Sequence, residues 1–277
     1  MRDKGFNRNE SFRTFYESVG ERYPEEDLVY DSLRGRVRKK FVLSHLTSFR
    51  GRFLDLGCNR GTYISHYSNG TAIGVDIAMP VLRLARTRAV GAKFVQGDGQ
   101  DLSFIRSDTI DAILCSEMIE HVVDAQKVLS ECYRVLKPDG KLLVTTPNYK
   151  KNKPEWISIG EMAAYGVEGM RGELYYHTAF RPEELQALAR RAGFEQLEAG
   201  TFEKEVKYAT RIPVLLYHLV DKLNRVTLNS SNLDRRNSHM LERASLLVYR
   251  ASRVLGLDAV LVRLCKEGVR TFLLARK

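Results

Sequence analysis

The sequence predicts an α/β protein built around a doubly wound, mostly parallel sheet. From Arg52 to about Phe202, short apolar runs alternate with amphipathic segments. The runs have the length of buried strands, and the segments between them repeat their apolar residues at helical spacing. Strands that alternate with helices form a parallel sheet whose two faces are both covered. The apolar runs are Phe53–Leu56, Thr71–Val75, Ala92–Val95, Ile110–Cys115, Lys141–Thr145 and Glu195–Phe202.

Two of the predicted helices have clear ends. Asp124 is a suitable N-cap for a helix over Ala125–Lys137, because its carboxylate can accept a hydrogen bond from the first turn. Pro182 suits the first turn of a helix over Glu183–Arg191, and Gly193 suits the position after its last turn. These boundaries support the alternation of strands and helices.

The pattern divides the chain into three parts. Residues 1–50 predict an N-terminal helical extension, and residues 51–202 with 268–277 predict the α/β core. Residues 203–267 predict a helical insertion, in which a polar stretch at Asn229–His239 separates two amphipathic segments. We expect the insertion to act as a lid or acceptor-binding region.

Composition bounds the class of protein. The chain of 277 residues contains no apolar run of the roughly 18 residues that a membrane span needs, and its charged N-terminus lacks a secretory signal. We therefore expect a cytoplasmic protein. The four cysteines form no CxxC pair, which argues against a disulfide framework or a thiolate zinc site. The formal net charge of +10 favours acidic partners or simply serves solubility.

The sharpest local signal is a glycine-containing turn after the first strand. Gly57 and Gly61 let the backbone pass close to a ligand, and Asn59 between them tolerates a left-handed conformation. The next strand ends at Asp76, where a carboxylate can accept hydrogen bonds from ribose hydroxyls. The third strand leads to Asp98 on the same edge. These positions predict a nucleotide-like ligand.

A dinucleotide-binding oxidoreductase is the natural alternative. Its fingerprint is G-x-G-x-x-G, whereas this chain has Gly57-x-x-x-Gly61 with Asn59 in place of the second glycine. No glycine is then available beside a pyrophosphate, so a ligand without a pyrophosphate fits better.

Several motifs within about Gly51–Phe202 resemble the class I S-adenosylmethionine-dependent methyltransferases, most closely the ubiquinone-biosynthesis O-methyltransferase-like group. The resemblance implies a Rossmann-like seven-stranded sheet in the order 3-2-1-4-5-7-6, with the last strand antiparallel. The motifs are Asp55–Gly61, Gly74–Ala78, Gly97–Phe104, Asp111–Glu117 and Val135–Pro147.

The resemblance also implies S-adenosylmethionine as cofactor. Asp55 and the turn at Gly57–Gly61 would face its methionine end, Asp76 its ribose and Asp98 its adenine amino group. Many members have glycine where this chain has Asn59. The expected cofactor-binding residues are Asp55, Gly57, Cys58, Asn59, Gly61, Asp76, Ile77, Asp98, Gly99 and Ser116.

A second group of residues follows the fourth strand. In a helical turn, Glu117, Glu120 and His121 would point the same way. His177, after the fifth strand, borders the same crevice. Such oxygen and imidazole ligands suit Mg²⁺, Mn²⁺, Fe²⁺ or Zn²⁺. The pattern also resembles metal-dependent ubiquinone-biosynthesis and small-RNA 2′-O-methyltransferases, which implies ligand roles for these four residues.

Other roles stay open for this group. Many methyltransferases without a metal have E-H-V here, where it shapes the substrate pocket or caps a helix. Catalytic roles are expected for His121, His177 and Glu117, with one histidine as general base in the absence of a metal.

The acceptor is expected to be an oxygen on a small, lipid-like or isoprenoid-linked molecule. RNA is the alternative, since the same basic charge would attract it, although no RNA-binding module is present. A non-catalytic protein that binds S-adenosylmethionine is a further alternative. The basic, amphipathic segment 203–267 would either pack on its own domain or make a peripheral membrane contact.

Overall fold

The computed structural model describes residues 8–227 and 231–277, which form two compact units. The first unit comprises the described part of 1–26 together with 43–200 and 271–277. The second comprises 27–42 and the described part of 201–270. The domain boundaries expected from the sequence stay a prediction, as does a lid role for 203–267.

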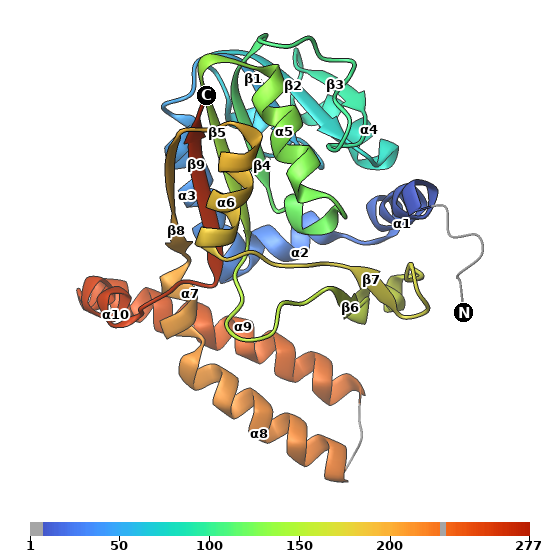
Figure 1. Ribbon diagram of the computed structural model, residues 1–277. Helices are drawn as coiled ribbons and strands as arrows, with labels where there is room; N and C mark the ends of the chain where they lie inside the picture. Colours follow the sequence, from blue (N-terminus) through green and yellow to red (C-terminus); the bar gives the residue numbers. More distant parts are fainter. Residues whose placement is uncertain (1–7, 228–230) are drawn as a thin grey trace. The chain divides into compact units, whose positions relative to one another are not determined.

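A seven-stranded sheet organises the first unit, in the order β3-β2-β1-β4-β5-β9-β8 (Figure 1). The strands from β1 to β5 are parallel, and the last strand, β9, is antiparallel. This confirms the predicted fold class and strand order. The strands are β1 (Gly51–Leu56), β2 (Gly70–Asp76), β3 (Lys93–Gln96), β4 (Ile110–Ser116), β5 (Leu136–Pro147), β8 (Gln196–Phe202) and β9 (Arg270–Arg276).

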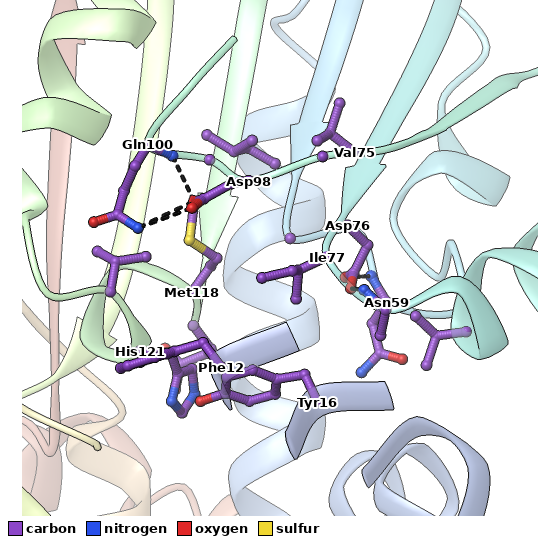
Figure 2. A pocket seen from close by; sticks show the side chains of 18 of the residues that line it. Phe12, Tyr16, Asn59, Val75, Asp76, Ile77, Asp98, Gln100, Met118 and His121 are labelled. Carbon is purple, nitrogen blue, oxygen red and sulfur yellow. Dashed lines mark hydrogen bonds between the residues drawn. The ribbon is translucent and has the colours of Figure 1, made fainter. Parts of the chain in front are cut away.

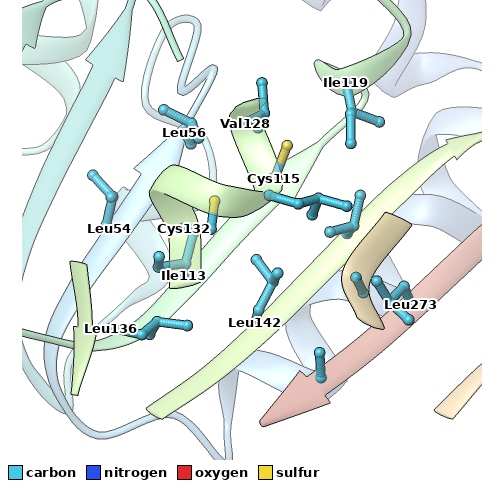
Figure 3. Close-up of a cluster of buried hydrophobic side chains, with 14 of the residues drawn as sticks. Leu54, Leu56, Ile113, Cys115, Ile119, Val128, Cys132, Leu136, Leu142 and Leu273 are labelled. Atoms are coloured by element: carbon cyan, nitrogen blue, oxygen red, sulfur yellow. The ribbon is translucent and has the colours of Figure 1, made fainter. Parts of the chain in front are cut away.

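Two helices, α5 (Ala125–Val135) and α6 (Pro182–Ala192), lie side by side on one face of this sheet (Figure 1). Their apolar sides pack against the strands in one continuous cluster (Figure 3). Burial of this cluster is the main source of stability for the sheet, at about 25 cal/mol per Å² of apolar surface. Its members from β1, β4, β5, β9 and the two helices include Leu54, Leu56, Ile113, Cys115, Leu142, Leu273, Val128, Cys132 and Leu185.

The ends of α5 and α6 follow the predicted signals. The Asp124 carboxylate accepts a hydrogen bond of 3.0 Å from the backbone N–H of Lys127. Pro182 opens α6, and Gly193 follows it with φ of 109°, a conformation that favours glycine. Both predicted helices are confirmed, although α5 ends at Val135 because β5 already begins at Leu136.

The other elements of the chain are shorter. The predicted N-terminal helical extension contains three helices, while its residues 1–7 lie outside the described residues. After β5, the strands β6 (Trp156–Ser158) and β7 (Leu174–Tyr176) form a separate antiparallel pair. The remaining elements are α1 (Arg8–Arg22), α2 (Glu25–Asp31), α3 (Leu33–Leu46), α4 (Met79–Arg88) and the 3₁₀ turns Ile64–His66, Ile119–His121 and Gly160–Tyr165.

The second unit is helical in 203–267, as predicted. It contains α7 (Lys204–Ala209), α8 (Arg211–Thr227), α9 (Ser231–Val254) and α10 (Asp258–Leu264). The expected polar connection at Asn229–His239 is wrong from Ser231 onward, and its first two residues lie outside the described part. Asn237 explains the error, because its buried amide donates to the Tyr217 carbonyl at 2.9 Å, so a polar residue serves the contact between α8 and α9. No helix in the described ranges is long and apolar enough to cross a membrane.

Candidate functional site

A cavity of about 390 Å³ lies at the carboxyl ends of the strands in the first unit (Figure 2). Parallel strands place their carboxyl ends at one edge of a sheet, which is where α/β proteins bind ligands. The loops after β1, β2, β3 and β4 form most of its wall, and α1 completes it. The lining residues are Phe12, Tyr16, Val19, Gly20, Glu25, Leu56, Gly57, Asn59, Val75, Asp76, Ile77, Ala78, Val81, Gly97, Asp98, Gly99, Gln100, Glu117, Met118, His121, Val122, Val123, Asp124 and Lys127.

The turn after β1 requires glycine at Gly57. Its φ is +77°, and a Cβ atom there would lie 2.6 Å from Cγ of Met118. The N–H groups of Gly57 and Cys58 both donate to the Val75 carbonyl, at 2.8 and 3.0 Å. The turn is therefore bonded to β2 while it presses against the loop after β4. This close packing leaves bare backbone at the cavity wall.

Two acidic side chains line opposite parts of the cavity (Figure 2). The Asp76 carboxylate accepts hydrogen bonds from the N–H groups of Asn59 at 2.8 Å and Ala78 at 2.9 Å. Burial raises the pKa of Asp76, and these two bonds partly oppose that shift. The Asp98 carboxylate accepts from the backbone and the amide of Gln100, at 2.8 and 3.1 Å. Both carboxylates are thus held in fixed orientations.

Six of the ten expected cofactor-binding residues line the cavity, namely Gly57, Asn59, Asp76, Ile77, Asp98 and Gly99. The other four are not among the described residues that line it. Asp55 and Cys58 are buried, and Ser116 Oγ lies 2.8 Å from Thr145 Oγ1. A Cβ atom on Gly61, whose φ is +72°, would lie 3.2 Å from Ala85 Cβ, so this glycine allows α4 to approach.

Asp55 is an unfavourably placed carboxyl group. It is 1% exposed, and its Oδ2 has no hydrogen-bond partner among the described residues. Burial raises the pKa of Asp55 to about 8, and the nearby charge of Asp76 adds to this increase. An isolated buried carboxylate is costly, so the cofactor-free protein keeps Asp55 protonated over most of the neutral range.

Three of the four expected metal ligands come together. One ligand atom from each of Glu120, His121 and His177 lies within 4.8 Å of the others. Glu120 is almost fully buried, and its Oε1 and Oε2 lie 3.9 Å from His121 Nε2 and 3.2 Å from Thr146 Oγ1 respectively. The rings of His121 and His177 meet edge to face, with centroids 4.9 Å apart. This cluster adjoins the cavity through His121.

Glu117 is not a member of this cluster. The helical turn after β4 covers only Ile119–His121, and Glu117 precedes it with φ of +55°. The Glu117 N–H donates to the Thr145 carbonyl at 2.9 Å, and its Oε1 accepts from Thr145 Oγ1 at 3.2 Å. Glu117 thus lies before the turn and bonds to Thr145 of β5, while its charge still acts to raise the pKa of His121 against the effect of burial. Glu117 still lines the cavity.

His121 is held in its neutral form. Burial lowers the pKa of His121 to about 3, and the neighbouring His177 contributes to this shift. Its Nδ1 is buried without a hydrogen-bond partner in the described part of the chain. A neutral imidazole can bind a metal ion or accept a proton.

The contribution of α1 to the cavity was not expected from the sequence. Phe12, Tyr16, Val19 and Gly20 line one side of it, and Glu25 follows shortly after α1. These residues lie far along the chain from the loops that they face. The sequence signals on this helix were the adjacent aromatic residues Phe15 and Tyr16 and the small residue Gly20. They do not indicate which residues far along the chain the helix will contact.

Comparison with known proteins agrees with this geometry. A family profile described as "Methyltransferase domain" matches residues 54–144. A ubiquinone biosynthesis O-methyltransferase from Idiomarina loihiensis is 30% identical over 174 residues, which cover 58% of this chain and 69% of that protein. A protein of the same name from Xanthomonas axonopodis pv. citri is 29% identical over 168 residues, covering 57% of this chain and 69% of the relative.

Solved structures share the fold. Phosphoethanolamine N-methyltransferase 2 of Haemonchus contortus, in complex with S-adenosyl-L-methionine, has a TM-score of 0.56 at 18% identity and covers 96% of this chain and 60% of its own. A methyltransferase structure from Thermotoga maritima has a TM-score of 0.54 at 18% identity and covers 95% of this chain and 99% of its own. At these identities the likeness concerns the fold alone.

The chain belongs to the class I S-adenosylmethionine-dependent methyltransferases. It is an enzyme that takes its methyl group from S-adenosylmethionine.

The pKa of Asp55 predicts a pH dependence of stability. Between the ordinary pKa of 3.8 and about 8, the unfolded chain releases the Asp55 proton while the folded protein retains it. The free energy of unfolding therefore falls as pH rises through this window, by at most about 1.4 kcal/mol per pH unit. Asp55→Asn removes this loss, so the cofactor-free variant should gain stability over the wild type from about pH 4 to about pH 8.

Urea unfolding at several pH values measures this difference. Asp139→Asn is the matched control, because Asp139 is exposed and has φ of 65°, which asparagine tolerates. If Asp55→Asn loses stability relative to wild type as pH rises, Asp55 is ionised in the folded protein and the assignment is wrong.

Proposed function

We propose that the enzyme methylates a hydroxyl oxygen of a small or isoprenoid-linked molecule. Glu120, His121 and His177 form what we call the imidazole–carboxylate cluster. The observation that carries this proposal is the position of His121, which belongs to this cluster and also lines the cavity. A methyl donor in the cavity would thus have groups beside it that can activate a hydroxyl. The names of the relatives from Idiomarina and Xanthomonas support an oxygen acceptor.

The cavity residues fit S-adenosylmethionine. The bare backbone at Gly57 would admit the methionine end. Asp55, whose Oδ2 has no hydrogen-bond partner among the described residues, would give up its proton when the cationic ammonium or sulfonium group binds nearby. Asp76 would accept from the ribose hydroxyls, and Asp98 from the adenine amino group. The acceptor oxygen then attacks the methyl carbon as the carbon–sulfur bond breaks, and the sulfur takes the bonding electrons.

A divalent cation fits Glu120, His121 and His177. One carboxylate and two imidazoles suit Mn²⁺, Fe²⁺ or Zn²⁺ and also admit Mg²⁺. The neutral state of His121 and its orphaned Nδ1 support this role, since a ligating nitrogen must be unprotonated. Such an ion lowers the pKa of a bound hydroxyl. Glu117 would act from the cavity wall, outside the three ligands.

A metal-free site is the competing account. His121 or His177 would then serve as general base, a role that typically contributes about 10²–10⁴-fold. The low pKa of His121 opposes this role, because an efficient base has a pKa near the working pH. His177 is then the better choice for the base.

The acceptor class is tested by following labelled methyl from S-adenosylmethionine into cell material. Organic extracts and total RNA are incubated separately with the enzyme. We expect label in a small organic-soluble compound, in a linkage that resists mild acid and base as a methyl ether does. Label in RNA alone would support the alternative 2′-O-methyltransferase and reject the small-molecule acceptor.

The cation is tested by chelation. EDTA treatment should lower the rate by at least about 10-fold, and one of the four named ions should restore it. Glu120→Gln should weaken Mn²⁺ binding in titration calorimetry about 10–100-fold, more than Glu117→Gln does, because only Glu120 is in the cluster. The exposed Glu161 provides the control Glu161→Gln. Full activity after EDTA together with unaltered Mn²⁺ binding by Glu120→Gln would leave the histidine base as the remaining account.

We further propose that the second unit contacts a membrane surface that carries anionic lipid. One side of α8 presents apolar residues that are 56–78% exposed, at helical spacing. On α9, exposed arginines and apolar residues alternate along one stripe, which matches an anionic surface with an apolar interior. The α8 residues are Ile212, Leu215, Leu216, Leu219, Leu223 and Val226, and the α9 stripe is Arg236, Met240, Arg243, Leu247, Arg250 and Val254.

Co-sedimentation with vesicles tests this contact. The wild type should bind vesicles of phosphatidylcholine with phosphatidylglycerol and should not bind pure phosphatidylcholine. Changing both Arg243 and Arg250 to Gln should weaken binding roughly 30-fold, since each basic residue contributes about 1 kcal/mol. Val90→Ser, at an exposed valine of the first unit, is the control. Equal binding by the double variant, or a dimer whose formation accounts for the apolar face of α8, would reject the contact.

A further inference from the structure

We infer that Tyr16 is a catalytic residue that contacts the methyl acceptor, its hydroxyl donating a hydrogen bond to the acceptor oxygen. The inference rests on the proposed transfer of methyl to a hydroxyl oxygen, and it assigns a role to a residue of the N-terminal helix α1.

Tyr16 lies where cofactor and acceptor must meet. It lines the same cavity as Gly57, Asp98 and His121. Its ring meets the His121 ring edge to face, with centroids 5.5 Å apart. Figure 2 shows Tyr16 together with Phe12 and His121 on one side of the cavity, facing the loops that carry Asp76 and Asp98.

The Tyr16 hydroxyl has no hydrogen-bond partner among the described residues. Its oxygen is also buried. A buried polar group without a partner costs about 1–3 kcal/mol, so such groups are rare unless a ligand completes them. Phenylalanine would fill the same space without that cost. The hydroxyl therefore indicates a polar ligand atom that arrives with the substrates.

The ring is held in place by its helix. Phe15, beside it, is buried and stacks on Tyr175 with centroids 5.2 Å apart. A Cβ atom on Gly20 would lie 2.8 Å from Val81 Cγ1, so glycine lets α1 lie closely against α4. Glu17 accepts from the Gln96 amide at 3.0 Å, which ties the helix to the end of β3. A hydroxyl on so fixed a support is oriented before the acceptor binds.

The contacts of Tyr16 place it between the two halves of the site. Its ring meets His121 of the imidazole–carboxylate cluster, and it lines the same cavity as Asp76 on the cofactor side. An acceptor oxygen held at the cluster and directed at a methyl donor in the cavity would therefore pass beside Tyr16.

The hydrogen bond leaves Tyr16 chemically unchanged. The acceptor oxygen forms a bond to the methyl carbon, the carbon–sulfur bond breaks, and its electron pair stays on sulfur. The proton of the acceptor passes to His177 or, with a metal ion bound, to water, while Tyr16 keeps its own. Tyr16 thus aims an oxygen lone pair at the methyl carbon and favours the ionised, more nucleophilic form of the acceptor.

The test compares Tyr16→Phe with Tyr23→Phe, using 4-nitrocatechol as a hydroxyl acceptor whose visible absorption reports its ionisation. Tyr23, just after α1, packs against the same hydrophobic cluster as Tyr16 but is not among the described residues that line the cavity. The control therefore removes the same hydroxyl from a nearby tyrosine. Tyr16→Phe should lower kcat/KM for 4-nitrocatechol about 10–100-fold, as expected for a hydrogen bond to a charged oxygen. It should also shift the absorption of the bound compound, and Tyr23→Phe should do neither.

Two further measurements separate this role from others. The Kd for S-adenosylmethionine and the Tm of Tyr16→Phe should match those of the wild type, or the Tm should rise because an unpartnered hydroxyl is gone. Weaker S-adenosylmethionine binding with unaltered acceptor kinetics would make Tyr16 a cofactor contact, and a lowered Tm or failure to fold would make it structural. Either result, or wild-type kinetics and absorption, overturns the inference. A wild type that methylates no hydroxyl compound rejects the proposed function itself.

Discussion

The left-handed turn at Gly57 is the constraint on which the whole site depends. It ends the inner strand β1, bonds to the carbonyl of Val75 in β2, and leaves no room for a side chain beside Met118 after β4. Strand β2 and the loops after β1 and β4 are therefore brought together by one backbone conformation. Because β1 pairs in register with both β2 and β4, any shift of this turn would displace Asp76 and the loop that carries His121.

The site concentrates groups that a stable interior avoids. Asp55 is buried, His121 has a buried Nδ1 and lies beside a second imidazole, and among the described residues Asp55 Oδ2, His121 Nδ1 and the Tyr16 hydroxyl have no hydrogen-bond partner. Each costs free energy in the cofactor-free protein. The apolar cluster under α5 and α6 provides the stability that offsets this cost. The cationic methyl donor is a kind of ligand that relieves it.

The fold was predictable because its signals are local. Apolar runs of strand length, the Asp124 cap and the glycine at Gly193 each act within a few residues, so the order of strands and helices followed from the sequence together with the resemblance. The polar stretch before His239 failed for a physical reason as well. Asn237 obtains its hydrogen bond from Tyr217 on another helix, and no local pattern announces such a partner.

The sequence by itself determined where the glycine turn lies and that carboxylates follow the strand ends, because neighbouring residues encode strand ends and backbone conformation. It also showed the pattern of Glu120, His121 and a later histidine. Only the tertiary structure decided how these groups combine. Glu117 has a left-handed backbone conformation and bonds to Thr145, and α1 brings Tyr16 against His121. Such contacts join residues far apart in the chain, and packing of the whole unit, not local preference, selects them.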